Sequence, residues 1–138
     1  MSDPRAFISF DFDHNEIEKH LFVGQSKNSK TPFFIEDWSS KTSLPQNQWE
    51  NIIDNKINKC NMLIILVGKY MASASGVSKE IGFAKKNNVP IFGIYVGGAD
   101  TNSNLPIGLP RNRTISWNWD YIEDAIRQVM NEDKNEQK

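Results

Sequence analysis

One carboxylate in this chain has surroundings that suit it for chemistry. Glu80 lies in the segment Ser73 to Val96, which follows the apolar run Met62 to Val67. This stretch predicts a buried strand, a small-residue loop, a short amphipathic helix opening around Val77 and a second buried strand. Glu80 then lies beside the end of the first of these strands. In open α/β sheets ligands bind at that edge, and the small residues before Glu80 leave room for one.

The pattern around Glu80 also has a plainer interpretation. A glutamate in the first turns of a helix is often only solvated and favoured by the helix dipole. Likewise, Asp11, Asp13 and His14 could contact a cation, but the simpler expectation is that Asp13 caps a helix and His14 is solvated. No paired Cys or His spacing suggests zinc, so no metal is expected.

Apolar runs alternate with amphipathic stretches along the whole chain. Two capping boxes, Asp13 with Glu16 and Ser43 with Gln46, mark helix starts. The helices are expected to turn apolar residues inward, among them Ile17, Leu21 and Phe22 in the first. The predicted strands cover residues 5–10, 32–38, 62–67, 89–96 and 114–117.

This alternation predicts an α/β fold, a flavodoxin-like, doubly wound sheet of five parallel strands with helices on both faces. Right-handed crossovers favour strand order 2-1-3-4-5. The order reverses between strands one and three. The crevice there is expected to be lined by residues 10–13, by residues 68–70 and by the start of the Glu80 helix, with Trp38, Ser39 and Ser40 as a wall from strand two.

Several chemistries known on this fold lack their motifs. A receiver domain needs an aspartate ending strand three and a lysine ending strand five, where this chain has Leu66-Val67-Gly68 and Ser116-Trp117. A flavodoxin needs a phosphate loop rich in Ser, Thr and Gly after strand one, and the loop here is acidic. No Walker or G-x-G-x-x-G pattern occurs.

Length and composition limit the classes of protein to which the chain can belong. With 138 residues the chain is expected to form one domain over residues 1–130, and the polar tail 131–138 to fray. The formal net charge is −1 with both signs scattered, which argues against a nucleic-acid partner. No apolar run reaches the roughly 20 residues of a membrane span, and no signal peptide is evident, so a cytoplasmic protein is expected. The single cysteine, Cys60, excludes an internal disulfide and is expected to be a buried hydrophobe.

Three segments together resemble a Toll/interleukin-receptor (TIR) domain. They are R-A-F-I-S-F-D at the start, the strand M-L-I-I-L-V-G, and V-S-K-E-I-G-F-A-K-K-N-N-V-P-I-F-G-I. More narrowly, they resemble the compact TIR-like proteins (ThsB type) of bacterial Thoeris antiphage systems. The resemblance covers about residues 5–130, and the order and spacing of the motifs carry it.

The resemblance implies a site. In TIR enzymes the glutamate of this helix is catalytic, and Glu80 occupies its position. The first-strand loop helps to bind the nucleotide, which here implies Phe10, Asp11 and Phe12. Many TIR enzymes carry tryptophan four residues before the glutamate, whereas this chain has Gly76. The remaining expected substrate-binding residues are Trp38, Ser39, Tyr70 and Ser73.

The activity that the resemblance implies is cleavage of the nicotinamide–ribose bond of NAD. NAD is then the substrate and no further cofactor is expected. Thoeris-type relatives make a cyclic or linear ADP-ribose-type signal that activates a separate effector protein, and a bare TIR-like domain fits such a signal producer.

Two other classes of function stay open. A non-catalytic TIR adaptor would act by self-association, and Glu80 would then be dispensable. A nucleoside deoxyribosyltransferase-like enzyme would use the helix glutamate to attack a sugar carbon, and G-V-S-K-E-I-G-F-A is reminiscent of that family's E-x-G-x-A pattern. Turnover of NAD, base exchange on deoxynucleosides, or no chemistry at all would discriminate among the three.

Overall fold

The computed structural model describes residues 4–11, 14–27, 36–37, 46–71 and 75–134. Its strands form a parallel sheet in the order β2-β1-β3-β4-β5. The strands are β1 (Arg5–Ser9), β2 (Glu36–Asp37), β3 (Met62–Val67), β4 (Ile91–Tyr95) and β5 (Thr114–Ile115). The helices are α1 (Glu16–Ser26), α2 (Gln46–Asn58), α3 (Ser75–Lys86), the 3-10 turn η2 (Arg111–Arg113) and α4 (Trp119–Glu132). The predicted α/β class with a parallel sheet is confirmed.

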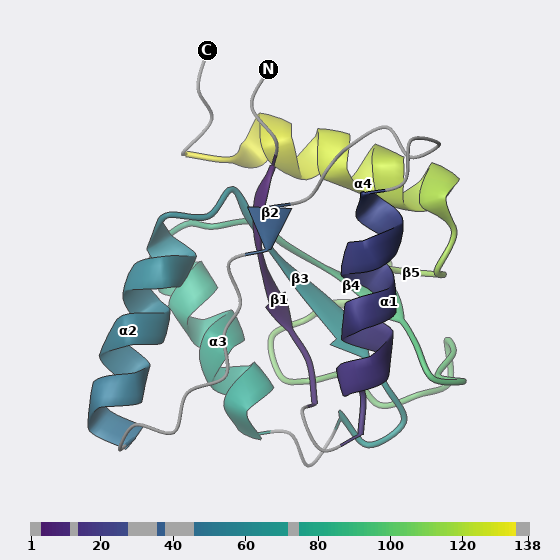
Figure 1. The fold of residues 1–138 in the computed structure, drawn as a ribbon, viewed down its shortest axis with the longest axis horizontal. Coiled ribbons are helices and arrows are strands. Elements are labelled where there is room, and N and C mark those ends of the chain that lie inside the picture. The colour runs from purple at the N-terminus through teal and green to yellow at the C-terminus, as the bar shows by residue number, and fades with distance from the viewer. Residues whose placement is uncertain (1–3, 12–13, 28–35, 38–45, 72–74, 135–138) are drawn as a thin grey trace.

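Helices cover both faces of the sheet (Figure 1). Side chains alternate along each strand, so the strands feed two separate cores. One core lies under α2 and α3 and takes Phe7, Leu63, Ile65 and Val67 from the strands. The other lies under α1 and α4 and takes Ala6, Ile8, Ile64 and Leu66. Every residue of β3 is buried, as expected for the strand with a layer on each side.

The structure shifts several predicted boundaries by one to three residues. Strand β1 ends at Ser9, and β4 and β5 are shorter than predicted. Helix α3 begins at Ser75, before Val77. Helix α1 begins at Glu16 with Asn15 at its N-cap, which makes no side-chain capping bond. Asp13 and Ser43, and most of the predicted strand 32–38, lie outside the described residues.

The predicted inward face of α1 is partly wrong. Phe22 is buried, but Ile17 and Leu21 are 74% and 53% exposed. The reason is the way the helix is docked: the Phe22 ring stacks on Trp119 with centroids 5.3 Å apart. Gln25 Oε1 also accepts hydrogen bonds from the indole N–H groups of Trp117 and Trp119. These contacts turn Phe22, rather than Ile17 and Leu21, toward the sheet.

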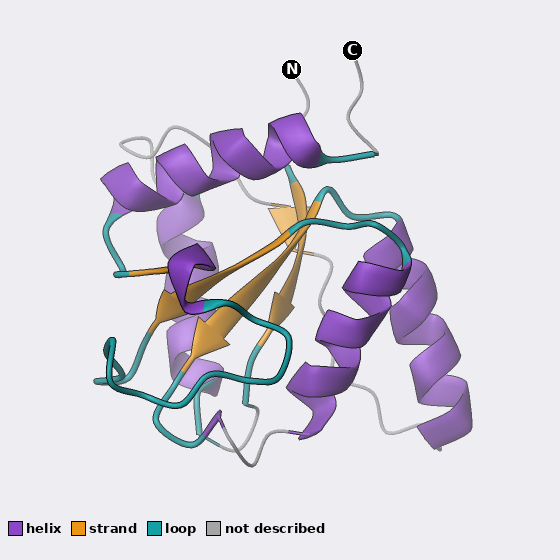
Figure 2. Ribbon diagram, turned by 180° about the vertical axis from the view of Figure 1, so that it is seen from behind, coloured by secondary structure: helices purple, strands orange, loops and turns teal. Residues whose placement is uncertain are grey.

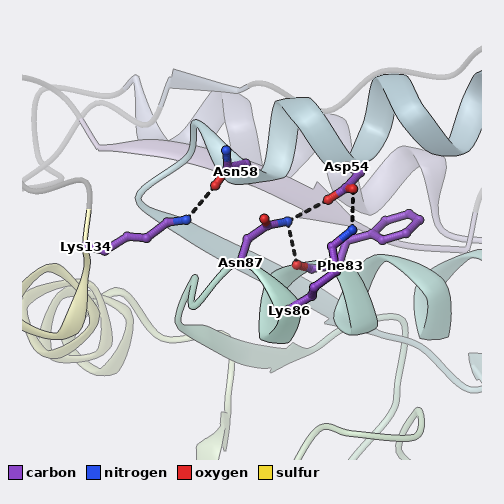
Figure 3. A network of polar contacts seen from close by, with 6 residues as sticks. All are labelled: Asp54, Asn58, Phe83, Lys86, Asn87 and Lys134. Atoms are coloured by element: carbon purple, nitrogen blue, oxygen red, sulfur yellow. Dashed lines mark hydrogen bonds and ion pairs between the residues drawn. The ribbon is translucent and has the colours of Figure 1, made fainter.

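A polar network on the opposite face joins α2 to α3 (Figure 3). Asp54 of α2 accepts hydrogen bonds from Lys86 Nζ and Asn87 Nδ2, both at 2.6 Å. Burial raises the pKa of Asp54, but the bonds from Lys86 and Asn87 and the Lys86 charge outweigh it, so the pKa lies below its ordinary value. Lys134 Nζ, just after α4, donates to Asn58 Oδ1 at 2.5 Å and ties the end of α4 to the end of α2.

We predict that Asp54→Ala lowers the free energy of unfolding at pH 7 by about 1 kcal/mol, because one partly exposed ion pair and one hydrogen bond are lost. The pKa of Asp54 is depressed in the folded state, so its stabilisation is present above the unfolded pKa and is lost as pH falls through the folded value. The difference between the two proteins should therefore narrow below about pH 4. Urea denaturation of both proteins at pH 7 and below about pH 4 measures this difference in the free energy of unfolding.

The matched control is Glu123→Ala on α4, which removes an exposed pair with Arg127 one helical turn away. That change should lower the free energy of unfolding by less than about 0.5 kcal/mol. An Asp54→Ala effect no larger than that of Glu123→Ala would contradict the structural role of the network.

Candidate functional site

The carboxyl ends of the parallel strands meet at one edge of the sheet, where the arrowheads of the longer strands point in Figure 2. Ser9 ends β1 there. It follows Phe7 by two residues, so its side chain faces α3. Glu80 lies on the buried stripe of α3, three residues after Val77 and four before Ala84. Sheet alternation and helix periodicity therefore bring Ser9 and Glu80 together.

A short hydrogen bond joins these two residues. Ser9 Oγ donates to Glu80 Oε1 at 2.6 Å, and both residues are buried. Burial raises the pKa of Glu80 to about 8, although the hydrogen bond from Ser9 acts in the opposite direction. The free protein consequently holds Glu80 mostly as the neutral acid at pH 7. A cation brought next to it would favour the carboxylate and lower this pKa.

A second polar cluster lies just beyond β1. Asp11 is only 7% exposed, and its Oδ2 lies 2.6 Å from His14 Nδ1. The His14 ring stacks on Tyr70, which follows β3, with centroids 4.3 Å apart and planes at 28°. The backbone N–H groups of His14 and Asn15 both donate to the Asp11 carbonyl, which turns the chain back. His14 is exposed over 42% of its side chain, as expected for a solvated residue, but it is also paired with Asp11 and stacked on Tyr70.

Asn15 fills the space above the end of β3. A Cβ at Gly68 would lie 2.1 Å from Asn15 Oδ1, so only glycine fits at position 68 while Asn15 is so placed. Asn15 Nδ2 donates to Glu18 Oε1 at 3.1 Å. Its Oδ1 is buried and has no hydrogen-bond partner among the described residues. Asn15 thus joins the loop after β1 to the ends of β3 and, through Gly97, β4.

The structure places four of the predicted site residues. Asp11 and Tyr70 are joined through His14 at the carboxyl edge, and Glu80 is bonded to Ser9, two residues before Asp11. Phe10 is buried in the core under α1 and α4. Phe12, Trp38, Ser39 and Ser73 lie outside the described residues.

Sequence reasoning missed the partners of the predicted residues. Ser9 could have been found, because it lies two residues after the inward-facing Phe7 and at the end of a strand. Asn15 and the His14–Asp11 pairing carry no comparable signal. At Gly76, where many TIR enzymes have tryptophan, a Cβ would meet no heavy atom within 4 Å, so the position is open.

The described residues hold no group of three or more His, Cys, Asp and Glu side chains placed to bind a metal ion. Within the same residues, no helix has the length and apolar character needed to cross a membrane.

Comparison with known proteins supports the fold and the family. A prokaryotic SEFIR domain of known crystal structure superposes with a TM-score of 0.53, at 14% sequence identity, over 92% of this chain and 90% of that one. This likeness concerns the fold alone. No curated protein matches the chain. Residues 7–101, more than half of the chain, match the family described as Thoeris protein ThsB, TIR-like domain.

This match runs from the middle of β1 to beyond the end of β4 and includes Ser9, Asp11, His14, Tyr70 and Glu80. The TIR resemblance predicted from the sequence is thereby confirmed, and the chain belongs to the family of Thoeris ThsB TIR-like domains.

Proposed function

We propose that this protein cleaves the nicotinamide–ribose bond of NAD and converts the ADP-ribosyl part into a nucleotide signal that activates a separate effector in antiphage defence. The reaction would take place in the cytoplasm with NAD as substrate. The observation that carries the proposal is the buried Glu80, held by Ser9 at the carboxyl edge of the sheet in a member of this family.

One carboxylate is sufficient for the chemistry. Nicotinamide in NAD is a cationic leaving group, so its departure needs no general acid. The transition state resembles an oxocarbenium ion, as in glycoside hydrolysis. A carboxylate beside the ribose can accept hydrogen bonds from the sugar hydroxyls and stabilise the developing positive charge. The group that captures ribose C1′ decides whether the product is ADP-ribose or a cyclic isomer.

The neutral state of Glu80 in the free protein fits this role. Burial keeps the pKa near 8, and the approach of the positively charged pyridinium ring would lower it. Substrate binding would then generate the catalytic carboxylate by releasing its proton. Ser9 Oγ donates to Oε1 and stabilises the ionised form in the same position.

A second candidate function is a non-catalytic adaptor that acts by self-association. The observation in its favour is the exposure of Ile17 and Leu21, one turn apart on α1. Apolar side chains exposed together on one helix face can pack against another protein surface. In that case Glu80 would be dispensable, so a Glu80→Gln variant discriminates between the two functions.

We predict that Glu80→Gln lowers nucleotide production by at least about 100-fold, because the amide keeps the size of the acid and cannot stabilise an oxocarbenium ion. The measurement is mass spectrometry of nucleotides from phage-challenged cells that express either protein. Deoxynucleosides should undergo no base exchange with the wild-type protein.

Glu123→Gln serves as the matched control and should leave production unchanged, because Glu123 is a partly exposed residue of α4, on the other face of the sheet from α3. Wild-type product levels from folded Glu80→Gln protein would refute the enzymatic proposal and favour the adaptor.

We also predict that Glu80→Gln stabilises the fold, increasingly so between pH 5 and pH 8. The folded pKa of Glu80 is raised, so its favourable contribution is complete below the unfolded pKa and is lost as pH rises through about 8. Over that interval wild-type stability should fall by about 1.4 kcal/mol per pH unit relative to the variant. Urea denaturation of both proteins across this pH series measures the slope; parallel curves would show that Glu80 is ionised in the free protein.

A final prediction concerns the signal. Protein-free filtrate from phage-challenged cells that express the wild type should activate the cognate effector in a separate tube, because a nucleotide passes the filter. Filtrate from Glu80→Gln cells should not. Activation that requires direct mixing of the two proteins, and never occurs with filtrate, would show that contact transmits the signal.

A further inference from the structure

We propose that His14 is a second catalytic residue: a general base that takes the proton from the nucleophile that replaces nicotinamide at ribose C1′. This assignment rests on the proposed cleavage of NAD and names the group that completes the reaction. Asp11 is its positioning residue, and Tyr70 holds the plane of its ring. Sequence reasoning treated His14 as solvated, whereas the structure gives it three fixed relations to its neighbours.

The first relation is the bond to Asp11. Oδ2 of this buried carboxylate lies 2.6 Å from His14 Nδ1. A carboxylate can only accept, so the neutral imidazole carries its proton on Nδ1. Nε2 then presents a lone pair, and it has no hydrogen-bond partner among the described residues. The buried carboxylate also stabilises the imidazolium that forms once Nε2 accepts a proton.

The second relation is the stack on Tyr70. With centroids 4.3 Å apart, the phenol ring covers one face of the imidazole and fixes its tilt. His14 keeps 42% of its side chain exposed, while its partner Asp11 keeps only 8%. His14 is thus accessible to a ligand, while the buried Asp11 holds its ring in place. A general base requires this combination of access and fixed orientation.

The third relation is position. Asp11 follows Ser9 by two residues, so their Cα atoms are at most about 7 Å apart. Ser9 holds Glu80, and Asp11 holds His14. The two pairs therefore flank one end of β1, at the edge where strand order reverses between β1 and β3. A ribose between them could meet Glu80 and its attacking nucleophile could meet His14.

The step balances without any other reagent. The C1′–N bond breaks and its electron pair stays on the nicotinamide nitrogen, which becomes neutral. A lone pair of the acceptor, either water or a nucleophilic atom of the same nucleotide, forms the new bond to C1′. The acceptor's proton moves to His14 Nε2 and afterwards to solvent. Glu80 stabilises the cationic sugar, and His14 prevents a proton from remaining on the product.

The main test is His14→Asn. The asparagine amide can still donate to Asp11 from the position of Nδ1, so the buried carboxylate keeps its partner while the base is removed. Purified protein would be mixed with NAD and with extract of phage-challenged cells that lack the gene, and products would be measured by mass spectrometry. Turnover should fall about 100-fold or more, the usual contribution of a general base.

His20→Asn is the matched control. His20 is the only other histidine in the chain and lies on the exposed side of α1, beside Glu16. This variant should turn over NAD at the wild-type rate. Calorimetric titration with ADP-ribose should give the same affinity for wild type and His14→Asn, which separates loss of a base from loss of binding.

Chemical rescue distinguishes a catalytic role of His14 from a purely structural one. In His14→Ala, added imidazole should restore turnover in proportion to its concentration, and it should not restore Glu80→Gln. Full activity of His14→Asn, or no rescue of His14→Ala in a protein that folds, would overturn the role of His14 and leave the proposed function standing. A wild-type protein that does not turn over NAD in the challenged extract would overturn both.

Discussion

The hydrogen bond between Ser9 and Glu80 is the contact on which the candidate site depends. It joins the first strand to the third helix across residues far apart in the sequence, and it lies where water has been excluded. A carboxyl group is hard to bury, since desolvation disfavours its charged form. The fold tolerates it here as a neutral acid with one donor. The same burial that lowers stability at neutral pH makes the group responsive to a cationic ligand.

The two-core architecture keeps this arrangement rigid. The strands send alternate side chains to α2 and α3 on one face and to α1 and α4 on the other, so β1 cannot shift without disturbing both cores. The side chain of Ser9 therefore faces α3, because strand alternation places it on the same side as the buried Phe7. The side chain of Glu80 faces the sheet, because it lies on the same buried stripe of α3 as Val77 and Ala84. The site is positioned by packing that extends well beyond it.

Sequence reasoning reached those parts of the molecule that local pattern determines. The wholly apolar run Met62–Val67 could be assigned as the buried central strand, and Glu80 could be placed at the edge by topology and by its match to the TIR glutamate. The sequence pattern gave wrong or no predictions where tertiary contacts determine the orientation of a side chain. Ile17 and Leu21 satisfy a helical stripe, yet the stacking of Phe22 on Trp119 turns them outward. The pairing of Asp11 with His14, and the stack on Tyr70, depend on a turn that propensity does not specify.

Asn15 and Gly68 behave as one unit, although they lie far apart in the sequence. The amide oxygen of Asn15 occupies the volume that any side chain at position 68 would need. The pair therefore offers a marker for comparing members of this family. A relative that keeps both residues can fold its first loop over the third strand in the same way. A relative with a larger residue at position 68 must route that loop differently, and the carboxyl edge of its sheet would then have another shape.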